Sequence, residues 1–475
     1  MENILIKDII KDLDIYPRRN ESPKTIEAYA EALEAGAKFP PILVQRISAN
    51  DSNECLVFLD GVHRAKAHER VQRQSIEAEY WKDEVLNKER WITQLQLESA
   101  RRNIAHGTAL QSEDKQQQAR KICEENWDIT EQEIADALGV LQRTVSNWVS
   151  DIKLKQKAER GAIIYRLAKL GWAHEEIAET VGLARSTVTE KMSVLAELLK
   201  LTKTFLDRGD SVEEVAGKLN LDVQLAWSLA LEGLDDLQRL EMLNEKIKGL
   251  SCKPRPYDVW NFSDCHKLMG YQYVGNIPGQ LILQLLYFYT KQQDIIVDPM
   301  AGSGTVVDAC LLMNRQCLAY DNNPLSSDKR IDIRKSDAIE AIRGLKHKAN
   351  LIFLDPPYFK KKEKEYGPIS ISSLSRSEYL DYFTSLSKEC IKRITPDGRV
   401  GLLMSDYTED DPSESIFIHL YISRFEQQGF TVERIIQCPL PPEQLRADSY
   451  LKFTKSRKLG WLSRYLVVFC ATRTK

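Results

Sequence analysis

The sequence predicts a multidomain protein with a small α+β domain over residues 1–85, an all-helical middle over 86–250 and an α/β domain over 257–475. Three observations support this division. At 475 residues the chain is too long for one ordinary core, because domains usually hold about 100–200 residues. Strand-like patterns vanish after residue 85. Short apolar runs return beyond 245–257, a segment whose glycine and prolines indicate a linker.

The composition is that of a folded, soluble protein, with 43% hydrophobic and 28% charged residues. A net charge of −3 gives no overall basic field, so any nucleic-acid surface must be a local patch. The nine cysteines lack the spacing of zinc knuckles or redox pairs, which indicates reduced thiols. The first residues mix charged with apolar side chains, and no run approaches the roughly 18 apolar residues of a membrane span. We therefore expect a cytoplasmic protein with no membrane partner.

The first domain mixes two kinds of pattern. Residues 26–33 have helical spacing, whereas 42–44 and 55–59 are short apolar runs bounded by turn residues. After the second run, Gly61, His63 and Arg64 stand at the start of a predicted helix. A helix amino terminus with a basic side chain is the outline of an anion site.

The helical middle contains an internal repeat. A small residue, a turn residue four positions on and a core residue six further on occur three times, the third time more loosely. The sets are Ala135, Gly139 and Val145; Ala178, Gly182 and Val188; and Ala216, Asn220 and Ala226. In a helix-turn-helix the first residue permits close helix crossing, the second takes the left-handed turn and the third packs the second helix. The repeat predicts three tandem helix-turn-helix units.

The second helix of the first two units is rich in side chains that reach base edges and phosphates in a major groove. These candidate DNA-binding residues are Gln142, Arg143, Thr144, Ser146 and Asn147 in the first unit, and Arg185, Ser186, Thr187, Thr189 and Lys191 in the second. The third unit has Asp222, Val223, Gln224 and Leu225 instead, so we expect it to pack or to form a homodimer. An alternative for the first two units is a pair of helical hairpins that bind protein.

The last domain alternates apolar runs with helical patterns. Continuous apolar runs indicate strands buried on both faces, as in a parallel α/β sheet. The runs are 295–297, 317–320, 351–354, 400–404 and 465–469. Ligands of such sheets bind at the carboxyl ends of the strands.

A glycine-rich turn follows the first of these runs. The residues from Asp298 to Thr305 read Asp-Pro-Met-Ala-Gly-Ser-Gly-Thr and open a helix, which lets the backbone approach a ligand closely. Asp321 ends the next strand and is placed to accept both hydroxyls of a ribose. Asp337 and Ala338, after a third strand, are placed to meet an adenine edge. The alternatives are a tight turn without ligand and solvated strand-end acids.

The run 351–354 ends in Asp355, Pro356, Pro357 and Tyr358. The two prolines fix the backbone and leave their carbonyls as acceptors beside the carboxylate. If Asp355 and the carbonyl of Pro356 hold the two hydrogens of an exocyclic amine, its lone pair is aimed at an electrophile. Tyr358 offers a stacking face for a base. The alternative is an ordinary turn with a packed tyrosine.

The glycine turn, Asp321 and the Asp-Pro-Pro-Tyr sequence, in this order, closely resemble the amino-methyltransferases that transfer the methyl group of S-adenosylmethionine to adenine N6 or cytosine N4 of DNA. The resemblance implies a Rossmann-like S-adenosylmethionine-dependent methyltransferase domain over 257–475, in which 259–262 and 276–281 precede the glycine turn and cover the methionine end of the cofactor. The residues that it implies for cofactor binding are Asn276, Pro278, Asp298, Met300, Ala301, Gly302, Gly304, Thr305, Asp321, Asp337 and Ala338. Those that it implies for catalysis are Asp355, Pro356, Pro357 and Tyr358.

The same resemblance bears on the target. In this family an aspartate at the position of Asp355 favours adenine N6, and cytosine N4 is the alternative. No target-recognition domain is inserted between the glycine turn and Asp355. The basic loop 360–364 and the basic tail 443–475 are candidate phosphate contacts, and solvated charged faces are the alternative.

Residues 3–80 resemble the amino-terminal domain shared by ParB partition proteins and sulfiredoxin. The resemblance rests on Pro-Arg-Arg at 17–19, Phe-Pro-Pro-Ile at 39–42 and the segment 59–67. Val62 stands where sulfiredoxin has its reactive cysteine, so we expect no sulfinic-acid repair.

The ParB resemblance implies a site for a nucleoside triphosphate with magnesium. The residues that it implies are Gly61, His63, Arg64, Glu98 and Arg102. Ser99 departs from the asparagine of the family pattern, which puts nucleotide turnover in doubt. The alternative is that Arg64 pairs with an acid of its own domain.

Together these patterns predict a DNA methyltransferase that acts on an exocyclic amine of a flipped base, with DNA contacts from the helical middle. One alternative is a ParB-like DNA-binding or partition regulator whose methyltransferase fold only docks the cofactor. Another is methylation of a guanine amine in RNA, against which the helix-turn-helix units argue.

Overall fold

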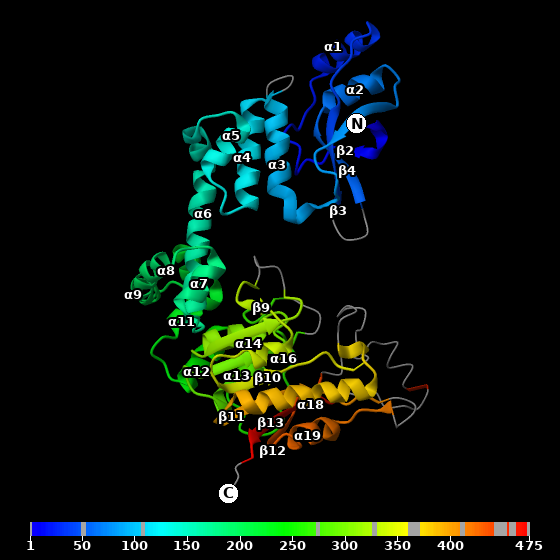
Figure 1. Cartoon of the computed structure of the whole chain (residues 1–475). Helices are drawn as coiled ribbons and strands as arrows, with labels where there is room; N and C mark the ends of the chain where they lie inside the picture. Colours follow the sequence, from blue (N-terminus) through cyan, green and yellow to red (C-terminus); the bar gives the residue numbers. More distant parts are fainter. Residues whose placement is uncertain are drawn as a thin grey trace. The chain divides into compact units, whose positions relative to one another are not determined.

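The computed structural model of the chain describes residues 2–48, 54–105, 110–271, 276–324, 330–359, 371–408, 414–440, 454–455 and 462–472. The contacts divide the chain into two compact units, Met1–Ala158 and Glu159–Lys475. The boundary falls inside helix α6 (Gln142–Lys169), which is drawn in Figure 1. The helical middle predicted from the sequence is therefore shared between the two units.

The first unit begins with a sheet whose order, in the described residues, is β1-β5-β3-β4-β2, with β6 paired to β3. The predicted helix 26–33 and the predicted strands 42–44 and 55–59 are confirmed, because they lie in α1, β3 and β4. The elements are β1 (Glu2–Leu5), η1 (Ile6–Asp8), β2 (Ile9–Ile10), α1 (Pro23–Glu34), β3 (Ile42–Ser48), β4 (Glu54–Asp60), α2 (Val62–Arg70), β5 (Ser75–Tyr80) and β6 (Leu86–Asn87).

Helices complete the first unit. They are α3 (Lys88–Ala105), α4 (Ser112–Glu125), α5 (Glu131–Leu138) and the start of α6. Ile134 and Leu138 of α5 pack with Val145 and Val149 of α6 in one core, as the repeat predicted. Gly139, between the two helices, has a φ of +56°, which is costly for a residue with a Cβ. Two packed helices joined by a left-handed turn therefore stand where the repeat predicted them.

The second unit contains the other two helix-turn-helix pairs. Gly182 ends α7 with a φ of +64°, and Asn220 ends α10 with a φ of +54°. Both turn predictions are confirmed, and Asn220 serves because asparagine tolerates the left-handed conformation. The helices are α7 (His174–Val181), α8 (Arg185–Ser193), α9 (Leu195–Asp207), α10 (Val212–Leu219), α11 (Val223–Ala230) and α12 (Asp236–Lys246).

The segment 245–257 was expected to be a linker, and the structure corrects this. Leu250 and Cys252 are fully buried. The side-chain amide of Gln284 donates to the carbonyls of Cys252 and Lys253, at 3.2 and 3.1 Å, and its oxygen accepts the backbone N–H of Arg255 at 2.7 Å. The glycine and prolines of this segment shape a packed connection. They misled the sequence analysis because glycine and proline are typical of fixed turns as well as of linkers.

The α/β part of the second unit has, in the described residues, a seven-stranded sheet of order β12-β13-β11-β10-β7-β8-β9. The strands are β7 (Ile295–Asp298), β8 (Gln316–Asp321), β9 (Ile333–Lys335), β10 (Ala349–Leu354), β11 (Ile394–Met404), β12 (Phe430–Gln437) and β13 (Tyr465–Ala471). All five predicted runs lie in strands. The direction of the last one was wrong, because β13 runs antiparallel to both of its neighbours. A strand covered on both faces is apolar throughout in either direction, so its sequence does not reveal its direction.

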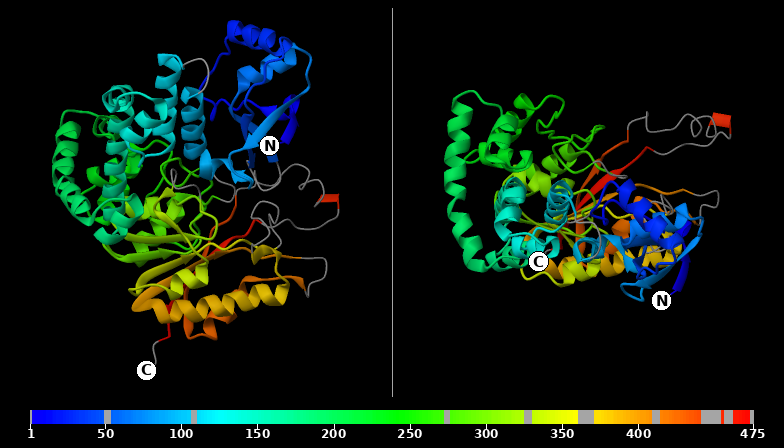
Figure 2. Two further views of the ribbon diagram at one scale, coloured as in Figure 1. Left: turned by 45° about the horizontal axis from the view of Figure 1, so that its top comes forward. Right: turned by 90° about the horizontal axis from the view of Figure 1, so that it is seen from above.

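Alternate residues of each central strand enter different cores. In β10, Leu351 and Phe353 pack on the side of α13 and α14, whereas Ile352 and Leu354 pack on the side of α16, α18 and α19. Figure 2 shows α18 lying along the sheet in both views. These elements are α13 (Gly279–Tyr289), α14 (Thr305–Leu312), α16 (Ala338–Arg343), η2 (Ile371–Ser373), α18 (Arg376–Arg393) and α19 (Ile418–Glu426).

The core beside α13 and α14 extends into the helical region. Leu170, Ile177 and Trp227 belong to the same cluster as Leu283 and Leu311. The helices from Glu159 onward and the α/β part therefore bury one continuous core. Within the described residues, no helix combines the length and the apolarity needed to cross a bilayer.

Candidate active site

Four of the predicted acids lie at one edge of the sheet. Strands β10, β7, β8 and β9 are neighbours and parallel to one another. Asp298 and Asp321 end β7 and β8, Asp355 directly follows β10, and Asp337 follows β9 by two residues. Because the carboxyl ends of parallel strands meet at the same edge, the fold brings these predicted site residues together.

Asp321 ties the glycine turn to the neighbouring strand. Its carboxylate accepts the backbone N–H of Gly302 and of Asn323, both at 2.9 Å. The N–H of Ala301 donates to the carbonyl of Tyr320 at 2.9 Å. The carboxylate of Asp321 is half-buried, and each of its oxygens has a second lone pair for a further donor. It therefore shapes the turn and retains acceptor capacity for further donors.

Two carboxylates of this edge have raised pKa values. Burial raises the pKa of Asp298 to about 8, the charges of Asp321 and Asp355 act in the same direction, and the N–H of Met300 opposes them. Burial also raises the pKa of Asp355 to about 7, against the opposing effects of the Arg464 charge and the Tyr358 hydroxyl. Perturbed carboxylates gathered at one edge are typical of functional sites.

The chain before α13 lies across the glycine turn. The hydroxyl of Ser303 donates to the side-chain oxygen of Asn276, and the N–H of Tyr271 donates to the carbonyl of Ser303 at 3.2 Å. The amide of Asn276 in turn donates to the carbonyl of Tyr271 at 2.6 Å. Pro278 is buried and precedes the first residue of α13. These contacts place Asn276 against the turn.

Gly304 has a structural reason that the sequence did not reveal. Its φ is +84°, and a Cβ at this position would lie 2.0 Å from the guanidinium carbon of Arg330. Glycine was expected here because a ligand approaches the backbone. The structure shows that an arginine occupies that space, so the glycine is required whether or not a ligand binds.

The loop after β10 is fixed by an aromatic cluster. The buried hydroxyl of Tyr379 donates to the carbonyl of Pro357 at 2.9 Å, and Phe359 packs against Tyr379 with ring centroids 5.1 Å apart. The hydroxyl of Tyr358 donates to Asp355 at 3.4 Å. Sequence reasoning did not find Tyr379, because its sequence position on α18 carries no sign of what it contacts. The bond from Tyr379 fixes the orientation of the carbonyl of Pro357, the residue after the predicted acceptor Pro356.

Arg464 is a second residue that sequence reasoning missed. It is buried, its Nε donates to the carbonyl of Cys438 at 3.2 Å, and its charge lowers the pKa of Asp355 against the effect of burial. It belongs to the basic tail 443–475, whose residues are candidate phosphate contacts in the sequence analysis, with a solvated charged face as the alternative. The basic loop 360–364 and most of that tail lie outside the described residues.

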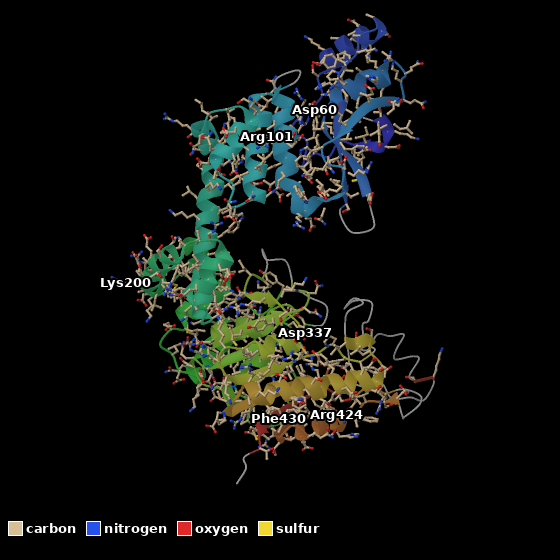
Figure 3. All side chains as sticks on the ribbon, viewed as in Figure 1. Asp60, Arg101, Lys200, Asp337, Arg424 and Phe430 are labelled. Atoms are coloured by element: carbon tan, nitrogen blue, oxygen red, sulfur yellow. The ribbon has the colours of Figure 1, made fainter. Side chains whose placement is uncertain are left out.

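Asp337 caps α16. One of its carboxylate oxygens accepts the N–H groups of Ile339 and Glu340 at 2.9 and 3.3 Å, and the side chain is exposed. Asp337 is labelled in Figure 3. Ala338 is buried. Capping explains an aspartate here without a ligand. The proposed contact with an adenine edge stays a prediction.

The predicted DNA-binding residues lie in the first turns of α6 and along α8. The side chains of Gln142, Arg143, Asn147, Arg185, Ser186 and Thr189 are exposed, whereas those of Thr144, Ser146, Thr187 and Lys191 are half-buried. Arg185 forms an exposed ion pair with Glu175 at 2.9 Å. In the third predicted helix-turn-helix, α11 packs against α14 and Asp222 caps α11. This helix pair is therefore part of the core beside α13 and α14.

The predicted nucleotide residues of the first unit are engaged with the protein. Arg64 is buried and donates to the carboxylate of Asp60 at 2.6 Å and to the carbonyls of Pro40 and Pro41 at 2.6 and 2.9 Å. Asp60 is labelled in Figure 3. These contacts are what the alternative interpretation of Arg64 expected.

The other members of that predicted site also have partners. Nε2 of His63 accepts the N–H of Ser22 at 2.8 Å, and burial, followed by the charge of Arg18, lowers the pKa of His63. Gly61 begins α2 with a φ of +100°. Glu98 and Arg102 pair with each other on α3 at 2.7 Å. Between them, Ser99 donates to the carbonyl of Leu59 at 2.7 Å, which explains a serine at this position by packing.

With this geometry in place, comparison with protein families gives one match. Residues 235–327 match the N6/N4 methyltransferase family model, which is described as DNA methylase. The matched segment spans α12, the glycine turn and Asp321, and it ends before Asp355. The carboxyl-terminal region is thus similar to DNA methylases over less than half of the chain. Comparison with curated proteins gives no match.

Solved structures give low-scoring similarities. TrmN from Thermus thermophilus is 14% identical over 41% of this chain and 49% of its own, with a TM-score of 0.27. Fibrillarin from Aeropyrum pernix with bound S-adenosyl-L-methionine is 12% identical over 38% and 67%, with a TM-score of 0.24. The truncated chromosome-partitioning protein ParB from Caulobacter crescentus, complexed to parS, is 14% identical over 46% and 99%, with a TM-score of 0.23. The alignment thus spans about half of TrmN.

Asp298→Asn should stabilise the protein at high pH. The native pKa of about 8 lies above the ordinary value near 4, so the native state holds a proton that the unfolded chain releases as the pH rises between these values. Native stability is therefore lost across this window, and asparagine removes the loss while keeping an acceptor for Met300. Urea unfolding should show the variant more stable than the parent at pH 8, by on the order of 1 kcal/mol or more. An equal gain at pH 5 and pH 8 would contradict the assignment.

Proposed function

We propose that the chain is an S-adenosylmethionine-dependent DNA methyltransferase that acts on an exocyclic amine, adenine N6 in preference to cytosine N4. One observation carries the proposal: the loop with Asp355 and Tyr358 and the turn with Gly302 follow adjacent parallel strands, beside Asp321 on the next strand. A carboxylate suited to an amine and a turn suited to a nucleoside thus lie at one edge. The family match to DNA methylases, which includes this turn, supports the same activity.

The residues of this edge fit S-adenosylmethionine, which when bound supplies an electrophilic methyl group. Asp321 retains lone pairs for the two ribose hydroxyls, and the turn from Met300 to Thr305 presents backbone to the cofactor. Asn276 and Pro278, which lie beside Ser303 and at the start of α13, belong to the segment that covers the methionine end. In this proposal Asp337 and Ala338 lie along the edge of the cofactor's adenine.

Asp355 and the carbonyl of Pro356 hold the two amine hydrogens of the target. Tyr379 keeps the adjacent carbonyl of Pro357 engaged, which fixes the backbone of the loop. The ionised form of Asp355 is the acceptor, and with a pKa of about 7 this form grows as the pH rises through neutrality. Tyr358, half-buried beside Asp355, offers its ring to stack on the base.

The target base must leave the duplex, because a stacked base cannot reach a carboxylate at the edge of a sheet. The exposed side chains at the starts of α6 and α8 make the DNA contacts in this proposal. Arg64 is paired with Asp60, so nucleotide binding by the first unit stays a prediction. The proposed methyltransferase activity does not depend on it.

The direct test is to map modified bases in DNA from cells that express the protein, with Asp355→Ala and Asp321→Ala as the deciding variants. Asp355→Ala should lower the transfer rate at least about a hundredfold, because it removes the acceptor that orients the amine. Its affinity for S-adenosylmethionine should stay within about threefold, since the cofactor binds elsewhere on the edge. Asp321→Ala should weaken cofactor binding first. Comparable methylation by Asp355→Ala would show that the catalytic assignment is wrong.

Tyr379→Phe should impair transfer without touching the cofactor. The change removes the donor to the half-buried carbonyl of Pro357, a hydrogen bond whose net worth is about 0.5–1.5 kcal/mol, and thereby loosens the loop. We expect the transfer rate at saturating cofactor to fall about tenfold. Tyr382→Phe, on the same helix, is the matched control and should keep the parent rate. Equal rates for the two variants would exclude a role of Tyr379 in holding the loop.

Arg143→Ala and Arg185→Ala should each weaken duplex binding. Each lost phosphate contact lowers the slope of log affinity against log salt by about one. Fluorescence titrations of a labelled duplex at several salt concentrations measure both quantities. Lys200→Ala is the control, because Lys200 is exposed on α9, the helix that follows α8 and carries none of the predicted DNA-binding residues (Figure 3). Affinities and slopes equal to those of the control would favour protein partners for these helices.

A further inference from the structure

Five charged side chains join the helical region to the α/β part of the second unit. Arg166 comes from α6, Asp222 caps α11, Asp308 lies on α14, and Arg330 and Asp332 precede β9. We call them the arginine–aspartate cluster. Their partners lie within one compact unit of the chain.

Arg166 contacts all three acids of the cluster. Its Nε donates to Asp332 at 2.8 Å, one terminal nitrogen donates to Asp222 at 3.2 Å and the other to Asp308. Arg330 binds two of the same acids from the other side, Asp308 at 3.1 and 3.2 Å and Asp332 at 2.9 and 3.1 Å. Asp308 and Asp332 are thus shared between two guanidinium groups.

Four of the five side chains of the cluster are buried, and the fifth, Asp222, is 35% exposed. The side chains of Asp308 and Asp332 are 2% exposed, that of Arg330 is 3% and that of Arg166 is 11%. Burial disfavours the charge of Arg166, but Asp332, Asp222 and Asp308 outweigh burial and raise its pKa. Burial likewise opposes the ionised form of Asp332, and the two arginines nevertheless lower its pKa. Two cations balance two fully buried anions, so each is necessary to the other three.

The cluster also touches both sides of the proposed cofactor site. Arg330 donates to the carbonyl of Gly304 at 3.3 Å and occupies the space where a Cβ of Gly304 would stand. Asp308 accepts the backbone N–H of Gly270 at 2.7 Å. Gly270 precedes Tyr271, whose N–H donates to the carbonyl of Ser303. Arg330 therefore holds the glycine turn and Asp308 holds the segment that crosses it. Arg166 is linked to both through Asp308 and Asp332, the acids that it shares with Arg330.

We infer that Arg166, a residue of the helical region, is a positioning residue of the cofactor site, an inference that rests on the proposed function. Without its charge, Asp308 and Asp332 share one cation, Arg330. The guanidinium of Arg330 then moves toward its two acids, and both Gly304 and Gly270 lose the geometry that it and Asp308 impose. Arg166 acts through these residues and has no contact with the reacting atoms in this scheme.

A second buried arginine provides the comparison. Arg315 also fastens the helical region, through two bonds of 2.5 and 2.7 Å to Asp236 of α12. It donates further to the carbonyls of Met313, Leu286 and Thr290, residues outside the glycine turn and outside the crossing segment. The Arg315–Asp236 pair therefore docks helices without holding the cofactor site.

The experiment compares full-length variants by calorimetric titration with S-adenosylmethionine. Arg166→Met removes the charge. Arg166→Lys keeps the charge but cannot contact all three acids at once. Because it leaves a cation beside the buried acids, Arg166→Lys is the variant more certain to fold. Asp236→Asn is the matched control. We expect the dissociation constant to rise about tenfold or more in Arg166→Met and several-fold in Arg166→Lys. The control Asp236→Asn should bind S-adenosylmethionine as the parent does, even if its melting temperature falls by as much as those of the Arg166 variants.

The kinetics separate positioning from a general loss of stability. In Arg166→Lys the KM for the cofactor should rise, while kcat at saturating cofactor stays within about twofold of the parent. The inference is overturned if Arg166→Lys binds the cofactor as the parent does, or if Asp236→Asn loses as much affinity. A parent protein that does not bind S-adenosylmethionine at all would overturn the proposed function instead, so the two failures are distinguishable.

Discussion

The burial of Asp308 within α14 constrains much of the second unit. A carboxylate without water needs cations and donors, and Arg166, Arg330 and the N–H of Gly270 supply them. Removing one member of such a buried set typically costs about 3–5 kcal/mol, because the others are left uncompensated. The position of α6, the space beside Gly304 and the path of the chain before α13 all follow from meeting this requirement.

Much of the fold could be predicted because local patterns determine it. The turns at Gly139, Gly182 and Asn220 were found from spacing alone, and the parallel strands brought Asp298, Asp321 and Asp355 to one edge as expected. The salt links could not be predicted. Arg166 and Asp308 are separated by 142 positions, and an arginine near the end of an amphipathic helix has the same pattern whether it faces solvent or a buried acid.

Residues with the right type for a ligand often had a structural partner. Arg64 pairs with Asp60, Asp337 caps α16, and Gly304 makes room for Arg330. A sequence motif shows that a residue type is needed, but it does not show whether a ligand or another part of the protein requires it. Asp298 and Asp355 differ from these residues, because no structural need explains them. Burial raises the pKa of both well above ordinary values, and a fold does not need such unfavourable carboxylates for stability.

The junction between α6 and β8 has an evolutionary consequence. The N–H of Cys317 donates to the carbonyl of Leu170, and Gly171 has no room for a side chain because Gln316 lies against it. A chain that lost helices α6 to α12 would expose the apolar residues of α13 and α14 that they cover and would leave Asp308 with one of its two arginines. Selection would then favour a neutral residue at position 308. Among descendants of such a chain, the buried aspartate and the helical segment should therefore be inherited or lost together.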